Sequence, residues 1–585
     1  IGASTDIDGH FTISLPENVK SLKVSYVGME TREVPITDGM MKIELSSSNV
    51  LEEVIAVAFG TAKKSAFTGS AAVVGAEELS KRVTTNVADA LVGTVPGLQM
   101  RGSSGAPGSD QGSMNIRGIS SMFADTDPLV IVDGSPYPAS LSNIPQGDIE
   151  SITVLKDAAS AALYGSRGAS GVIIITTKTG SDKESRVSLD AKWGANTRAI
   201  QRYDVIDNAG EFYEAYYDQV YNYYRYGNGY SHQQANLSAN NKMLSDLAYN
   251  VYNVPAGQTL IGLNGKLNPY ATLGNIITSR GQQFYLTPDN WDDLSYHTGL
   301  RQEYNVTVNG GTDKASYYAS LGYLDDEGFI RGSGYERLTA RFKGDFQAKP
   351  WLKLGINAGY VHSTTKQVPN RSVESSSMTN ENLAYYTDYI APIYPAFVRG
   401  VDADGKPYIK TDEYGHVAYD YGTPNSGYYL QRAFMGNGNP IGSNKYNKVE
   451  TIGNQLNASF TADFILTSYL KANITSSVTW GETELSDFEN PWYGSKASSN
   501  GQLDKSTTTT MRTNNIQTLT YFDAFGLHNV NVMAGHEWYK SEERYLYAMA
   551  RGSFSPWIPE SNAFASRPTS QSYKKGYNVE GYFGR

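Results

Sequence analysis

Residue types that carry enzyme chemistry are sparse in this chain of 585 residues. It contains no cysteine, which excludes disulfide scaffolds, thiolate metal sites, iron–sulfur clusters and cysteine nucleophiles. It also lacks a GxxxxGK(S/T) phosphate loop, a GxSxG elbow and an HExxH pair. The sequence therefore excludes most easily recognised enzymes and predicts no cofactor and no metal centre. Its seven histidines are scattered: His10, His232, His297, His362, His416, His528 and His536.

Four clusters of charged residues could hold a cation or support a reaction. They are Asp6-Ile7-Asp8-Gly9, Asp402-Ala403-Asp404-Gly405, the pair Asp325 and Asp326, and Lys156-Asp157 with Arg167. The first resembles the opening of a calcium loop but lacks the later ligands, so a hairpin turn explains it better. The second is also better explained as a turn. Adjacent acids on a strand point to opposite faces, and the last cluster is better explained as polar residues that bridge packed elements.

The composition narrows the class of partner. The chain has 49 Lys and Arg against 59 Asp and Glu, a net charge of −10, which argues against a nucleic-acid partner. It has 43 Tyr against only 19 Phe, and tyrosine suits places with one apolar and one wet side. No run of 18 apolar residues occurs, so a membrane-spanning helix is excluded. Membrane β-strands are not excluded, because they need only an alternation of apolar and polar residues and no long apolar run.

The first 64 residues predict a small domain and a linker. Residues 1–45 alternate in short pieces between turn signals, which is typical of a small antiparallel β-sandwich. Because the pattern opens within a hairpin, we expect a mature or truncated chain without its first strands. Residues 46–64 are a linker with a β-prone run at 51–60. That run is either an ordinary edge strand or a peptide that adds a strand to a partner's sheet.

Residues 65–182 predict a compact α/β unit, hereafter the plug region. Gly165 is expected to close the second of its two helices. The expected helices span 87–91 and 157–163, and the expected strands span 115–118, 129–134, 149–155 and 171–177.

Residues 183–585 alternate apolar with polar residues in segments of about ten residues, the pattern of a transmembrane β-barrel. About ten strands are expected, the last at 579–583. Tight turns and long connections alternate along the chain. This asymmetry is expected when one barrel end, with short turns, faces the periplasm and the other end, with long loops, faces the exterior. A barrel around a domain this large needs about 22 strands, so we expect about the first half of the transmembrane part. The tight turns are 310–314, 349–351, 467–468 and 525–528; the long connections are about 197–302, 363–453, 482–513 and 541–575, with a modest loop at 325–334.

Several motifs occur in one order along the chain. They are Ser4-Thr5-Asp6-Ile7-Asp8-Gly9-His10-Phe11, residues 51–64, Asn115-Ile116-Arg117-Gly118, residues 128–134 and 156–180, and the hairpin at 310–324. In this order they resemble the SusC-like (SusC/RagA type) TonB-dependent transporters of the Gram-negative outer membrane. They correspond to its carboxypeptidase-regulatory-like extension, TonB-box signature, plug motifs and an early barrel hairpin. Ala56 and Ala58 depart from the Val and Gly expected there.

The resemblance implies a mostly β protein. Its parts would be a transmembrane antiparallel barrel of about 22 strands, about ten of them in residues 183–585, around an internal α/β plug domain at 65–182. A partial N-terminal β-sandwich extension would occupy residues 1–45, before a linker at 46–64. The TonB box would be Glu53, Val54, Ile55, Ala56 and Val57.

The resemblance also implies active import without chemistry on the substrate. A SusD-like lipoprotein would cap the barrel as a lid, and TonB, energised by ExbB and ExbD, would pull the box and remodel the plug. The other implied partners are outer-membrane lipid and a second copy, in a dimer of transporter–lid pairs.

Two segments are candidates for substrate or lid contact. In the first, Asn208 and Glu211 have capping-box spacing and predict a helix in the first long connection. Its tyrosines could stack on sugars, meet the lid or pack the connection on itself. The second segment is a Gly-rich plug loop that either faces the ligand or is a mobile turn. The candidates are Tyr213, Tyr216, Tyr217, Tyr223 and Tyr224, and in the loop Arg101, Ser103, Ser104, Asp110 and Gln111.

The leading functional hypothesis is import of oligosaccharides, because the long connections are rich in tyrosine. The same architecture could import peptides. A passive porin or adhesin would not need a plug or a TonB box, so deletion of residues 54–57 would leave its uptake unchanged. A surface enzyme would hydrolyse its substrate as a purified protein.

Overall fold

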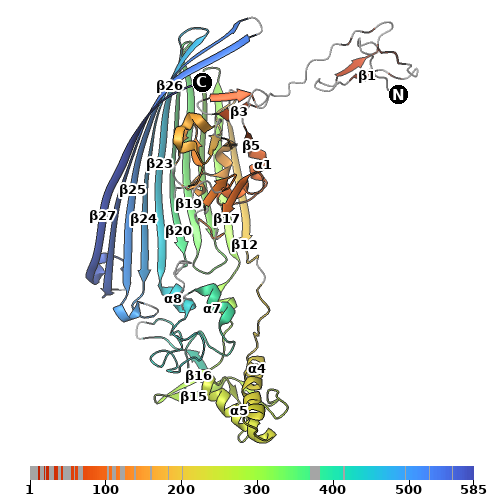
Figure 1. The fold of residues 1–585 in the computed structure, drawn as a ribbon, viewed down its shortest axis with the longest axis vertical. Helices are drawn as coiled ribbons and strands as arrows, with labels where there is room; N and C mark the ends of the chain where they lie inside the picture. Colours follow the sequence, from red (N-terminus) through yellow and green to blue (C-terminus); the bar gives the residue numbers. More distant parts are fainter. Residues whose placement is uncertain are drawn as a thin grey trace.

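A long, curved sheet dominates the computed structural model (Figure 1). The structure describes residues 11–13, 19, 21–24, 32–36, 41, 43, 54–57, 60–63, 70–101, 105–108, 113–118, 126–137, 140–157, 161–181, 184–199, 202–368, 382–412, 415–493, 496–525, 528–555 and 558–585.

Ten strands form this antiparallel sheet, hereafter the β-wall, and each pairs with its neighbours in the order of the chain. The number of strands is the one expected from the alternating pattern. The β-wall is an open part of a barrel, because its first and last strands are its two edges. The strands are β12 (Arg186–Asn196), β17 (Gly299–Thr312), β18 (Ala315–Glu327), β19 (Gly334–Lys349), β20 (Leu352–Gln367), β23 (Lys448–Ile465), β24 (Leu470–Glu489), β25 (Gln502–Phe525), β26 (His528–Ser553) and β27 (Phe564–Gly584).

The pairing register defines two faces of the β-wall. Leu354 lies opposite Ala462, which lies opposite Ile474, and this row belongs to the outer face. Asn357, on the same strand as Leu354 but of opposite parity, contacts the plug region on the inner face. Large apolar side chains are exposed along the outer rows, as the alternating pattern predicts; they include Val187, Leu189, Val306, Leu321, Leu338, Phe342, Ile356 and Phe460.

The connections differ from expectation at two places. The connections expected at 482–513 and 541–575 are shorter than predicted. β24 continues to Glu489 and β25 begins at Gln502, which shortens the first. β26 continues to Ser553 and β27 begins at Phe564, which shortens the second. Residues 507–510 are four threonines that pair with residues 481–484. Threonine favours strands but gives no apolar alternation, so these strand ends carried no hydropathy signal.

The plug region contains a five-stranded sheet in the order β5-β10-β11-β8-β9. Its strands are β5 (Ala71–Gly75), β8 (Leu129–Val132), β9 (Ser135–Pro136), β10 (Ile149–Leu155) and β11 (Val172–Thr177). A hairpin joins β6 (Leu98–Arg101) to β7 (Ser113–Ile116), and the helices are α1 (Ala76–Ser80), α2 (Val87–Leu91) and 3-10 turns at Leu141–Asn143, Gln146–Asp148 and Ala162–Gly168. Asn86 caps α2 by accepting the amide of Ala88. Leu91, Ile149, Ile152 and Ile175 are completely buried in its core.

The N-terminal part is described only in pieces. β1 (Ser21–Val24) pairs with β2 (Arg32–Pro35), and most of the expected β-sandwich lies outside the described residues, as does the Asp6-Ile7-Asp8-Gly9 turn. β3 (Val54–Val57) pairs antiparallel with β4 (Gly60–Lys63).

Two long connections of the β-wall, the one between β12 and β17 and the one between β20 and β23, fold together into one unit, hereafter the loop module (residues 203–296 and 383–447). β15 and β16 from the first of these connections share a sheet with β21 and β22 from the second. Its elements are α4 (Ala209–Asn222), a π-helical turn (Tyr223–Gly227), α5 (His232–Leu247), β13 (Tyr252–Asn253), β14 (Thr272–Leu273), β15 (Asn275–Ser279), β16 (Gln282–Leu286), α6 (Trp291–Ser295), α7 (Leu383–Tyr389), β21 (Arg399–Val401), β22 (Pro407–Ile409) and α8 (Pro440–Tyr446).

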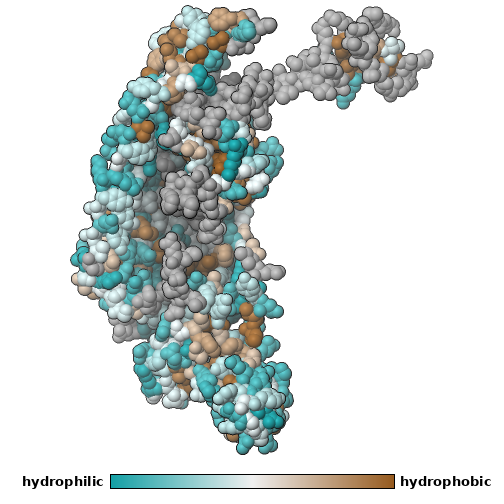
Figure 2. Space-filling view, viewed as in Figure 1, coloured by the Kyte–Doolittle hydropathy of each residue, from teal (hydrophilic) through white to brown (hydrophobic). Residues whose placement is uncertain are grey.

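Side-chain caps define where the module's longest helices begin. Asn208 accepts the amides of Gly210 and Glu211 at the start of α4, as its spacing predicts. Ser231 and Gln234 form a complete capping box at the start of α5. The surface around α4 and α5 is mainly hydrophilic (Figure 2). Among the helices of the described chain, none has the length and apolar content required to cross a membrane.

Candidate functional site

The segment expected to be the TonB box lies at one end of the β-wall. β3 lies near the tight-turn end, and α4 and α5 lie beyond the opposite end (Figure 1). Val54 pairs with Lys63 and Val57 with Gly60, so the segment has extended backbone in a two-stranded ribbon. Each strand of such a ribbon has one unpaired edge, which a third strand can join. Glu53 lies outside the described residues.

A charged clamp joins the plug region to the β-wall. Asp133, at the turn between β8 and β9, accepts hydrogen bonds from Arg341 at 2.6 Å and Asn357 at 2.8 Å. Lys343 lies 3.1 Å from the same carboxylate, and the Thr177 hydroxyl donates to it at 2.6 Å. Burial alone would raise the pKa of Asp133, but Lys343 and Arg341, with Thr177, outweigh it and hold the pKa below its ordinary value.

Further polar contacts join the same two parts. Asp148 of the plug region accepts from Tyr318 at 2.8 Å and Ser320 at 3.0 Å. Arg167 binds Glu537 of β26 at 2.6 Å. Asp157 accepts the backbone amide of Ser70. In the cluster of Lys156, Asp157 and Arg167, the last two residues therefore bridge packed elements, as predicted from the sequence.

The other acidic clusters are also structural. Asp402 accepts the amides of Asp404 and Lys406 and so closes a turn. Asp326 is buried on the inner face, where Asn196 donates to it at 2.6 Å, whereas Asp325 accepts from Gln302 at 3.3 Å. Among the described residues, no three acidic or histidine side chains are placed to hold a metal ion.

A polar cavity of about 400 Å³ separates the plug region from the inner face of β19 to β25. Ser142 and Asn143 line it from the plug region, and Tyr335 and Gln455 from the β-wall. Asn143 donates to Gln455 at 3.0 Å, which joins the two sides at the edge of the cavity. The wall contributes mostly hydroxyl groups, those of Ser363, Thr365, Thr451, Thr479, Thr508 and Thr510. These groups can hydrogen-bond a polar ligand.

The sequence patterns did not predict this cavity as a site, although the residue types that line it follow a regular pattern along the strands. The polar positions of the alternating strands are mainly Ser, Thr and Asn, and these residues line the inner face. Which of them meet the plug region depends on contacts between residues more than 190 positions apart, such as Asn143 and Gln455, 312 positions apart. Such contacts are not visible in local patterns.

The predicted plug-loop candidates are mostly outside the described residues. Arg101 ends β6, and Ser103, Ser104, Asp110 and Gln111 are not described. The loop does reach the cavity at Gly108. Gly108 has φ +67°, and a Cβ atom at this position would collide with the ring of Tyr335. Only glycine permits this close approach.

The five candidate tyrosines divide into two groups. Tyr213 and Tyr217 are almost completely buried in the loop module, and their hydroxyls bond to the Tyr249 carbonyl and to Asn236. This burial favours the packing interpretation for these two. Tyr223 is 62% exposed, whereas Tyr216 and Tyr224 are half-buried against the module core: Tyr216 donates to Asp246 at 3.1 Å, and Tyr224 stacks on Tyr230.

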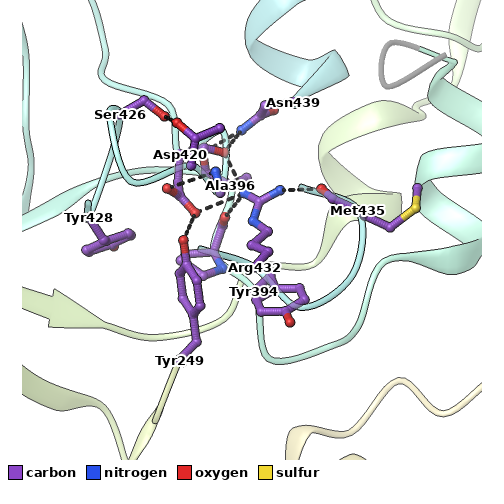
Figure 3. Close-up of polar contacts among 12 residues, drawn as sticks. Tyr249, Tyr394, Ala396, Asp420, Ser426, Tyr428, Arg432, Met435 and Asn439 are labelled. Carbon is purple, nitrogen blue, oxygen red and sulfur yellow. Dashed lines mark hydrogen bonds and ion pairs between the residues drawn. The ribbon is translucent and has the colours of Figure 1, made fainter. Parts of the chain in front are cut away.

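A buried ion pair holds the loop module together (Figure 3). Arg432 and Asp420, both completely buried, lie 3.0 Å apart. Tyr249, from the other segment of the module, donates to Asp420 at 2.8 Å. Burial raises the pKa of Tyr249, and the Asp420 charge raises it further. Burial also raises the pKa of Tyr386, which accepts from Arg432, to about 12. Both phenols therefore stay protonated at neutral pH, and the network joins two connections as one body.

Comparison with known proteins gives one family model and several relatives. The model of the TonB-dependent receptor plug domain matches residues 63–172. The chain is 30% identical to the TonB-dependent receptor SusC of Bacteroides thetaiotaomicron over 67% of this chain and 34% of that protein. It is 27% identical to the TonB-dependent receptor P26 of Formosa agariphila over 100% of this chain and 51% of that protein. It therefore spans a third to a half of these relatives.

Among solved structures, the RagAB peptide transporter is similar in fold, with a TM-score of 0.63 and 22% identity. The similarity covers 88% of this chain and 53% of that one. The similar proteins are receptors and transporters rather than enzymes.

Proposed function

The chain belongs to the SusC-like TonB-dependent transporters, and on this premise we propose that it is part of an outer-membrane importer of oligosaccharides. The observation that carries the proposal is the position of the plug region. It is clamped to the inner face of the β-wall, between a ribbon that a partner's strand can join and a polar cavity on the other side. Force applied at one end can thus act on the element that borders the cavity at the other.

The transporter is divided into the four parts named from the sequence. Residues 65–182 are the plug and residues 183–585 are part of the barrel. The linker at 46–64 carries the TonB box, Glu53 to Val57, after the extension at 1–45. TonB pairs with the exposed edge of this segment by β-augmentation and transmits force from the inner membrane.

The chemistry of the cavity favours oligosaccharides as the substrate. Its wall offers hydroxyl and amide groups, which donate to and accept from sugar hydroxyls. The exposed ring of Tyr223 on the loop module, with the half-buried Tyr224 beside it, provides a surface for sugar rings or for a SusD-like lipoprotein lid. The alternative is an oligopeptide substrate, which the fold also allows, as the RagAB peptide transporter illustrates.

A polar patch on the outer face supports a dimer of transporter–lid pairs. Gln517, on the outer row that contains Ile474, accepts from His536 at 2.7 Å through its Oε1 atom, and His536 lies 3.0 Å from Glu580. Beside them Ser476 donates to Asn515 at 2.8 Å. Polar groups facing lipid are costly, and hydrogen-bonding groups on this face suit a contact between two copies.

Uptake by cells tests the proposal. The full-length protein is expressed with its partner lipoprotein, with and without residues 54–57. Deletion of these residues should abolish uptake and leave membrane insertion intact, whereas deletion of the linker residues 46–49, of equal length, should preserve uptake. Uptake unchanged by loss of residues 54–57 would identify a passive pore. Mass spectrometry of ligands that co-purify with the complex then separates oligosaccharides from peptides.

A further inference from the structure

The inner wall of the cavity carries one cation that differs from the others on this face. Arg512 of β25 lines the cavity opposite Thr479 and two positions from Thr510. Within the described part of the chain, its guanidinium forms no hydrogen bond or ion pair. It is therefore a charged group in a cavity whose other wall side chains are mainly hydroxyls and amides.

Other arginines on the inner face show what is unusual about Arg512. Arg341 binds Asp133 at 2.6 Å, Arg301 binds Glu303 at 2.9 Å, and Arg337 donates to the Ser142 carbonyl. Each of these guanidinium groups has a partner in the plug region or in the β-wall. They hold the structure together, a role that Arg512 does not share.

Two carboxylates lie near Arg512, and within the described residues neither forms an ion pair with it. Glu482 borders the cavity, but it lies opposite Asn454, which accepts from the outer-face residue Tyr360 at 2.9 Å, so its side chain belongs to the outer face. Glu543, on the adjacent strand, is close enough to interact electrostatically with Arg512, but its ion pair is with Lys575 at 2.9 Å.

We infer that the cavity is a binding site for an anionic group on the transported molecule, a carboxylate or a sulfate, and that Arg512 recognises it. The inference rests on the proposed function and narrows its substrate to acidic oligosaccharides. A guanidinium pairs with such oxyanions through two parallel hydrogen bonds, and the charge strengthens both. The surrounding threonines would bind neighbouring sugar hydroxyls. The site would therefore recognise one charged group within an otherwise neutral segment of the oligosaccharide.

Ligand retention tests this inference. The full-length protein is purified with its partner lipoprotein after exposure to a mixture of oligogalacturonates and their methyl esters, and of a sulfated oligosaccharide and its desulfated form. Retained molecules are quantified by mass spectrometry. The unmodified protein should retain at least one acidic form about tenfold more than its neutral counterpart. Arg512→Gln should remove this preference, and Arg512→Lys should restore part of it.

The control is Arg544→Gln, because Arg544 lies opposite Thr509, on the other face of the sheet. It should leave the preference unchanged. Retention of neutral forms only, retention of no acidic molecule, or an unchanged preference in Arg512→Gln would overturn the inference. Acidic peptides carried over from the cells in place of glycans would support the anion site and contradict the oligosaccharide proposal. Loss of uptake on deletion of residues 54–57 is independent of all these results.

Discussion

Asp133 of the plug region lies 2.6 Å from Arg341 of the β-wall, and the two groups are 208 positions apart in the chain. Both side chains are largely buried. Removing one partner of a buried pair leaves the other charge uncompensated, which costs about 3–5 kcal/mol. Asp133→Asn should therefore loosen the plug region from the wall, with faster amide hydrogen exchange in β8 and β11. Asp345→Asn, in a half-exposed pair with Lys353, should change exchange little.

The pH dependence of this clamp follows from the low pKa of Asp133. A carboxyl whose folded pKa lies below its unfolded value of 3.8 stabilises the structure above that value. The contribution is lost only as pH falls through the lower, folded pKa. Exchange protection of the plug region should be constant from about pH 7 to pH 5 and should decline only below about pH 4. Release between pH 7 and pH 5 would show that another group controls the clamp.

The pair of Asp420 and Arg432 should hold the loop module as one body. Asp420→Asn keeps the size of the side chain but removes its charge, so we expect a loss of about 3–5 kcal/mol within the module. Limited proteolysis should then cut both 203–296 and 383–447 faster, while the β-wall remains intact. Lys266→Gln is the control, because Lys266 is the exposed partner of an ion pair with Glu214. It should leave the rate of proteolysis nearly unchanged. Faster cleavage of only one segment would contradict a single module.

Tyr213 and Tyr223 belong to the same tyrosine-rich segment, but replacing them should affect the stability of the loop module differently. Tyr213→Ala removes a fully buried ring and should cost about 3–5 kcal/mol of module stability. Tyr223→Ala removes an exposed ring and should change stability by less than about 0.5 kcal/mol. If Tyr223 contacts substrate or lid, its replacement should still weaken their binding, measured by calorimetry. Weaker binding together with equal stability loss in both variants would instead show a shared packing role.

Sequence patterns were sufficient where structure is local. The spacing of Asn208 and Glu211 predicted the start of α4, and period-two alternation predicted ten strands. Patterns failed where structure depends on distant contacts. Tyr213 and Tyr223 belong to one aromatic run, and only packing against distant parts of the module buries the first. The cavity likewise combines plug and wall residues, and the threonines at 507–510 extend β25 without any apolar alternation.

The polar patch on the outer face should mediate contact between two copies. His536 lies between Gln517 and Glu580, at 2.7 Å and 3.0 Å, on the face where neighbouring strands expose apolar residues. In a monomer these groups would face lipid, at a cost that depends on their depth. Replacing both His536 and Glu580 with Ala should shift the full-length complex from dimer towards monomer in native mass spectrometry. Val532→Ala, an exposed outer-face residue nearer the tight turn, should leave the dimer intact. A dimer unaffected by the double replacement, or an unmodified complex that is monomeric, would show that the patch has no such role.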